Sequence, residues 1–328
     1  MINKKLVLGV SLFLFGMMSY GQENLLNAKT PDEIGKKTAA EEALDNDNPL
    51  PYGYIGKRDI LFSKKVWETI DLNQRVNFPL YFPTENSANS GNLGAERKSL
   101  FVVLTEAIEA GTIKEIYADS YFITKKSYDD VKGLFFFSQI NSDGTDIYNR
   151  YQGEKKYKGW SEDKIIEDLK VRKLLNEEHF DTMRIKPDDV SAYQIVGVWY
   201  FDKRQGELKY RILGLCPLAP DALGKLRASQ EGKEDDLVPV PLFWVFYPSA
   251  RDVLHKAKGF NEKNSSMPLS FDHILNSRRF SSTITREENV YGDRDILDYL
   301  KDKSQMQLLE AERIKEKIRN FEQDMWNY

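Results

Sequence analysis

Three histidines and one cysteine are the first candidates in this 328-residue chain for metal binding or nucleophilic catalysis. The histidines, His179, His255 and His273, are isolated, and no two have the spacing of a zinc site. Cys216 lies in an apolar strand pattern with no adjacent histidine, which predicts a small buried side chain. We therefore predict no metal site and no cysteine nucleophile.

Three short motifs resemble functional sequences and fail on spacing. Ser270-Phe271-Asp272-His273 has the residue types of a catalytic triad, but neighbouring side chains on one helical turn point apart. The segment 91–99 lacks the spacing of a phosphate-binding loop, which favours a surface loop before a helix. The segment 141–146 lacks a glycine and a final glutamate at the offsets that a calcium loop requires, which favours a hairpin turn. We predict no catalytic residue and no cofactor.

The first 21 residues have the pattern of a secretory signal peptide. A basic start at Lys4 and Lys5 precedes the apolar run 6–18, and small residues lie at Ser19 and Gly21. The apolar run is shorter than a membrane-spanning helix requires. No cysteine lies near the expected cleavage site, so the sequence predicts a protein without its own lipid anchor and without a membrane span, exported to the periplasm.

Composition indicates a folded protein that does not bind nucleic acid. Hydrophobic residues make up 41% and aromatic residues 12%, enough for a core. Charged residues make up 30%, with a net charge of −4 and no basic stripe of the kind that nucleic acid needs.

The elements that follow the signal peptide predict an α+β fold with mixed helices, mostly antiparallel strands and a long C-terminal helix. Four parts are expected: a signal peptide (1–21), an extended or weakly ordered arm (22–55), an α+β core domain (56–300) and a C-terminal helix (301–328).

Hydrophobic periodicity and turn residues predict the main elements. Expected strands are 60–62, 66–72, 78–83, 113–117, 193–202, 207–216, 240–247 and 279–285. Expected helices are 95–111, 124–132, 161–179, 248–258, 270–276 and 293–324, the last broken near 302–304. The strands 193–202 and 207–216 form a hairpin, and the stripe Ile314, Ile318, Phe321 and Met325 is expected to dock on the body or on a neighbour.

Several segments together resemble one known family. They are 66–72 with 77–81, 199–203 with 211–215, 244–248 with Arg251, 279–282, and 312–315 with 321–326. In this order they resemble the GldN/PorN family of gliding-motility and type IX secretion proteins of the Bacteroidetes, from end to end of the chain.

The resemblance implies a non-enzymatic component of the type IX secretion machine. It implies a periplasmic ring that contains several copies of this chain and the GldK/PorK outer-membrane lipoprotein, in contact with the periplasmic part of GldM/PorM. It carries no catalytic residue onto this sequence. The alternative is a secreted hydrolase or a small-ligand-binding domain, which needs a deep pocket with converging titratable groups.

Overall fold

An antiparallel sheet forms the centre of the molecule. The computed structural model describes residues 48–84, 98–232, 237–259, 261, 269–301 and 303–326. The strand order is β11-β1-β5-β6-β8-β2, and β7 pairs with β6. The strands are β1 (Ile60–Asp71), β2 (Ile116–Tyr117), β5 (Ala192–Asp202), β6 (Glu207–Ala219), β7 (Val240–Pro241), β8 (Trp244–Phe246) and β11 (Thr283–Glu287). All their pairings are antiparallel, which confirms the predicted α+β class.

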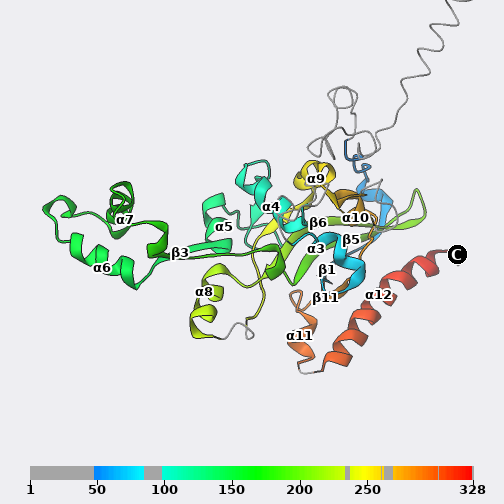
Figure 1. The fold of residues 1–328 in the computed structure, drawn as a ribbon. Coiled ribbons are helices and arrows are strands. Elements are labelled where there is room, and N and C mark those ends of the chain that lie inside the picture. The colour runs from blue at the N-terminus through cyan, green and yellow to red at the C-terminus, as the bar shows by residue number, and fades with distance from the viewer. Residues whose placement is uncertain are drawn as a thin grey trace, which may run out of the picture.

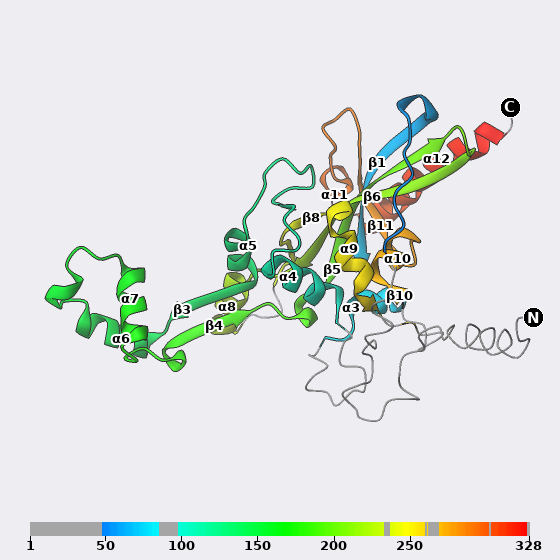
Figure 2. The ribbon, with the colours of Figure 1, turned by 90° about the horizontal axis from the view of Figure 1, so that it is seen from above.

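The predicted hairpin is confirmed as β5–β6. Asp202 pairs with Glu207, and Gly206 closes the turn at a φ of 67°, a conformation that costs glycine little. Figure 2 shows both strands projecting beyond the rest of the sheet, beside β1.

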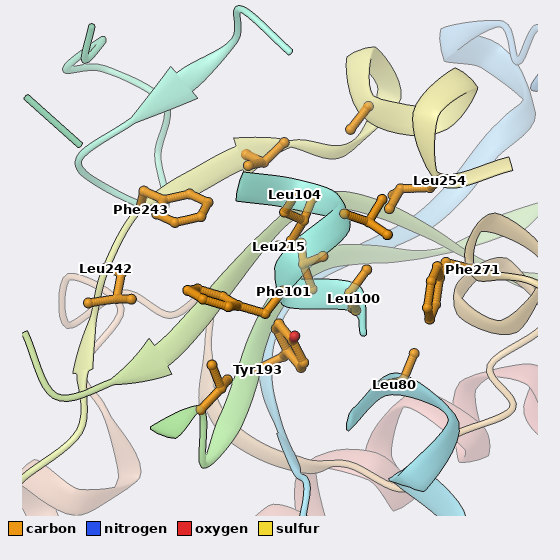
Figure 3. Close-up of a cluster of buried hydrophobic side chains, with 14 of the residues drawn as sticks. Leu80, Leu100, Phe101, Leu104, Tyr193, Leu215, Leu242, Phe243, Leu254 and Phe271 are labelled. Carbon is orange, nitrogen blue, oxygen red and sulfur yellow. The ribbon is translucent and has the colours of Figure 1, made fainter. Parts of the chain in front are cut away.

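Helices pack on the sheet around one large hydrophobic core. They are α3 (Phe78–Tyr81), α4 (Leu100–Glu109), α9 (Tyr247–Lys256) and α10 (Phe271–Asn276). Figure 3 shows Leu100 and Leu104 of α4 directed toward Leu215 of β6, with Tyr193 of β5 nearby. All four are almost fully buried, so α4 is held by packing.

A second unit stands away from the core. The two-stranded ribbon of β3 (Phe136–Ile140) and β4 (Phe180–Arg184) carries α6 (Ser142–Tyr151) and α7 (Glu162–Val171) at its far end (Figures 1 and 2). We call residues 141–179 the lobe. It has its own hydrophobic cluster around Leu169 and Tyr157. At the base of the ribbon lie α5 (Tyr128–Phe135) and α8 (Ala222–Glu231).

The chain ends in the predicted long helix. A short helix, α11 (Ile296–Tyr299), precedes α12 (Ser304–Trp326), so the break expected near 302–304 is present. Ile314 and Ile318 are buried against Val66 of β1 and Ile284 of β11, and Phe321 stacks on Phe62 of β1. The stripe therefore docks on the body.

The remaining small elements complete the described chain. Two short strands, β9 (Lys258–Gly259) and β10 (Leu269–Ser270), pair with each other beside α10. Single 3-10 turns are η2 (Lys57–Asp59), η3 (Arg75–Asn77), η4 (Lys155–Tyr157), η5 (Glu177–His179) and η6 (Pro187–Asp189). Within the described ranges, no helix combines the length and apolarity that crossing a membrane would require.

Three predicted elements are wrong in kind or length. The expected strand 78–83 begins with helix α3, because Pro79 needs no hydrogen-bond partner in the first helical turn. The expected turn 141–146 starts α6, where the Asn141 side chain accepts from the Gly144 N–H as an N-cap. The expected helix 161–179 ends at Val171, and Lys173 has a φ of 56°, which breaks the helix before His179.

Other boundaries shift. The expected strand 240–247 divides into β7 and β8, 113–117 shortens to β2, and 279–285 starts later as β11. The helix expected at 124–132 is α5, which Ser127 caps in a box with Asp130. The signal peptide, residues 22–47 of the arm and the glycine loop 91–97 lie outside the described residues.

A close contact within the hairpin gives a test of its packing. A Cβ at Gly197 of β5 would lie 2.3 Å from the ring of Tyr210 on β6, whereas a Cβ at Gly133 of α5 meets nothing within 4 Å. We expect Gly197→Ala to lower the free energy of unfolding by about 1–3 kcal/mol. Gly133→Ala should raise it by about 0.5–1 kcal/mol, because alanine favours helix. Urea unfolding of both variants measures the difference, and equal effects would contradict the contact.

Candidate functional site

A cleft of about 450 Å³ lies between the N-terminal segment and the body. One wall is formed by residues 50–55, which we call the strap, and the other by the β5–β6 hairpin, α9 and α10. Its charged and aromatic lining residues are Tyr52, Tyr54, Tyr200, Asp202, Arg204, Lys209, Tyr210, Arg211, Arg251, His255, Asp272 and His273.

A buried carboxylate organises the floor of the cleft. Asp272, on α10, is 5% exposed and receives two hydrogen bonds from Arg251 of α9, at 2.9 Å from Nε and 3.0 Å from Nη2. Tyr247 and Asn276 each donate to the same carboxylate at 2.8 Å. This fork-to-fork geometry with additional donors is that of a strong, fully satisfied ion pair.

The pKa values of the donors agree with that role. The hydrogen bond to Asp272 raises the pKa of Arg251, although partial burial acts in the opposite direction. Burial raises the pKa of Tyr247 far above its ordinary value, and the Asp272 charge adds to the effect. Both side chains therefore keep their protons at neutral pH and donate to Asp272.

The strap enters this cleft through one aromatic ring. The centre of the Tyr52 ring lies 4.2 Å from Cζ of Arg251 and 4.6 Å from Cζ of Arg211. Its hydroxyl donates to Oδ1 of Asn276 at 2.8 Å. The carbonyls of Gly53 and Tyr54 accept from Arg211 and Arg204, each at 3.1 Å. The last residues of the predicted arm thus pack on the body.

A second buried ion pair lies on the sheet where two hydrophobic clusters meet. Glu68 of β1 is 1% exposed and lies between Val66, which packs with α12, and Ile70, which belongs to the main core. Arg278, just after α10, donates to both of its oxygens at 3.1 and 2.7 Å, and Ser282 donates as well. Charge and packing together link β1 to the segment that leads into β11.

Aromatic rings surround the second guanidinium. Arg278 lies 4.2 Å from the ring centre of Tyr210 and 5.0 Å from that of Trp199. Burial alone would lower the pKa of Arg278, but the Glu68 carboxylate raises it above the ordinary value. Arg278 therefore stays charged opposite Glu68.

The residues considered for chemistry are not brought together. Ser270 caps α10 by accepting from the His273 N–H, His273 is exposed, and Asp272 points to Arg251. The His179 Nδ1 accepts from the Asn176 N–H, and Cys216 is buried with a raised pKa caused by that burial. Among the residues that the structure describes, no three His, Cys, Asp or Glu side chains are placed to hold a metal ion.

Sequence reasoning assigned no role to the charged residues that organise these two sites. Arg211 and Arg251 lie in segments of the family resemblance, but their common partner Tyr52 lies more than 150 residues away. Glu68 offers the clearest local clue, because it occupies an apolar position of an alternating strand. A charge at such a position indicates a buried partner.

The strap should respond to alkaline pH through Tyr52. Burial raises the pKa of Tyr52 to about 12, with the Arg251 charge opposing the shift. The protonated hydroxyl is thus favoured in the folded state, and its contribution to stability is present below pH 10 and is lost between about pH 10 and 12. Tyr52→Phe has no hydroxyl at this position to ionise, so it has no such contribution to lose. We expect the free energy of unfolding in urea to fall more steeply above pH 10 for the wild type than for Tyr52→Phe; parallel curves would contradict this.

The fold and its internal ion pairs define an α+β protein whose buried charges bind other parts of the same chain. The family model described as "Gliding motility associated protein GldN" matches residues 55–327. The chain belongs to the GldN family, as its sequence pattern predicts. A search of curated proteins found no match.

Proposed function

We propose that this chain is a non-enzymatic structural component of the type IX secretion and gliding machinery. In this proposal it forms a periplasmic ring with the GldK/PorK lipoprotein, which supplies the attachment to the outer membrane, and it contacts the periplasmic part of GldM/PorM. The observation that carries the proposal is the family match over residues 55–327, which associates the chain with gliding motility.

The shape of the chain supports a role in assembly. A ring of identical subunits needs two different surfaces on each copy, which meet head to tail. The sheet body and the lobe at the end of the β3–β4 ribbon offer such separate surfaces (Figure 2). Helix α12 is docked on one side of the body, and the lobe projects from the other side (Figure 1). This arrangement suits contacts with more than one neighbour.

The cleft beside the strap is one place where the hydrolase or ligand-binding alternative could have its site. Both oxygens of its buried carboxylate, Asp272, already accept hydrogen bonds from Arg251, Tyr247 and Asn276. A general acid or base needs a titratable group that is available to a substrate. Asp272 is therefore already engaged within the chain and is poorly suited to act as a general acid or base.

Deletion of the gene tests the proposal. We expect the deletion strain to lose gliding on a surface and export of type IX cargo proteins together, and the restored gene to return both. The assays are time-lapse imaging of cell movement and measurement of cargo protein in the medium. Normal export in a deletion strain that carries no second copy of the gene would contradict the proposal.

A further inference from the structure

Tyr52 is the strap residue whose side chain makes hydrogen-bond and cation–π contacts with the body. Tyr52 is partly buried in the cleft, whereas Leu50 and Tyr54 on either side of it are 82% and 87% exposed. The strap backbone adds the Gly53 and Tyr54 carbonyls, which accept from arginine side chains. A segment with one anchoring residue opens at a lower free energy than the core opens.

The site that receives Tyr52 is organised without it. Asp272 fixes the guanidinium of Arg251 through two bonds and fixes the Asn276 side chain through a third. Tyr247 also accepts from Asn276, at 3.0 Å. Because these groups bond to one another, they remain in place when the ring leaves, and such preorganisation favours rebinding.

Two guanidinium groups, 4.2 and 4.6 Å from the centre of one ring, make the site selective for an aromatic side chain. Each guanidinium within about 6 Å of a ring centre attracts the π-electrons of that ring. An aliphatic residue in place of Tyr52 would leave Arg211 and Arg251 without these ring contacts. The hydroxyl bond to Asn276 adds a preference for tyrosine over phenylalanine.

We propose that residues 48–55 form a latch, in which Tyr52 closes a tyrosine-binding cleft of the same chain and releases it reversibly. The occupant of the cleft is the chain's own segment. The open state is a minor population, of the order of 0.1–10% for two-state elements of this kind. Closure fixes where the chain that precedes residue 48 meets the body, and opening frees that point.

Cleavage by chymotrypsin after Tyr54 measures the opening. A protease needs its target segment free of the body. Although the Tyr54 side chain is exposed, the strap backbone is bound to the body, so the cleavage rate follows the population of the open state. We expect Tyr52→Ala in the full chain to speed cleavage after Tyr54 at least tenfold. Leu50→Ala is the matched control, because it removes an exposed side chain of the strap and should leave the rate within twofold of the wild type.

Two further measurements separate the latch from general effects. Synthetic peptides of residues 48–58 with the same substitutions give the intrinsic cleavage rate, to which each rate is normalised. The rate of cleavage within residues 100–320 reports whether the body still folds. This rate should be the same in each variant as in the wild type. Arg211→Ala, which keeps the strap sequence intact, should also speed cleavage after Tyr54, and Tyr52→Phe should lie between the wild type and Tyr52→Ala.

Two results would overturn the latch. The first is a normalised rate for Tyr52→Ala and Arg211→Ala within twofold of the wild type. The second is an equal acceleration by Leu50→Ala. If Tyr52→Ala disturbs the body, Arg211→Ala decides alone.

Discussion

Arg278→Ala is expected to lower the free energy of unfolding by about 3–5 kcal/mol, because it leaves the buried Glu68 carboxylate without its cation. Glu68 is 1% exposed, so its carboxylate relies on these hydrogen bonds in place of water. The substitution also removes a guanidinium stacked on Tyr210 and Trp199. Urea unfolding followed by circular dichroism at neutral pH measures the loss.

The neighbouring arginine supplies the control. Arg279 follows Arg278 directly and is exposed, so Arg279→Ala should change the free energy of unfolding by no more than about 0.5 kcal/mol. Replacing both partners, with Glu68→Leu and Arg278→Met together, should cost less than Arg278→Ala alone, since no buried charge is left unpaired. Equal losses for Arg278→Ala and Arg279→Ala would show that the pair contributes no stability.

Ile314→Ala in α12 is expected to cost about 2–5 kcal/mol, the range for truncating a buried isoleucine. Ile314 is fully buried in the cluster that joins α12 to β1 and β11. Its loss leaves a cavity between the helix and the sheet. Removal of the chain after residue 303 deletes the whole helix and should destabilise the protein further, because Val66 and Ile284 then face water.

Two leucines on the same helix provide matched controls. Leu308 and Leu309 are 58% and 63% exposed, so Leu308→Ala and Leu309→Ala should each stay within about 0.5 kcal/mol of the wild type. Thermal and urea unfolding of the three variants test whether α12 belongs to the folded body. An Ile314→Ala variant as stable as the leucine controls would contradict its docking.

Elements with strong local patterns could be predicted from the sequence. The β5–β6 hairpin follows from alternating residues around a glycine turn, α10 from its capping Ser270, and α12 from its apolar stripe. The family was also recognisable, because its segments are spread along the chain in order. These features depend on neighbours in the sequence.

Features that depend on distant contacts could not be predicted. The ribbon pairs Ile140 with Phe180 across the whole lobe, so neither strand is next to its partner in the sequence. The helix α3 was mistaken for a strand because its aromatic residues have high β-propensity, while Pro79 suits the first helical turn equally well.

The long-range contacts of the two sites show the same limit. Glu68 meets Arg278 across 210 residues, and the Tyr52 hydroxyl meets Asn276 across 224. A single sequence indicates that a buried charge needs a partner, but it does not identify the partner. Asp272 illustrates this, because it lies beside Ser270 and His273 in the sequence and binds Arg251 in the fold.

Co-assembly with the lipoprotein is the most direct test of the proposed ring. The full chain and the GldK/PorK lipoprotein are produced together, purified through a tag on the lipoprotein, and examined by analytical ultracentrifugation and electron microscopy. We expect both proteins to sediment together as a complex with several copies of each, visible as rings. A chain that sediments alone as a monomer, apart from the lipoprotein, would contradict it.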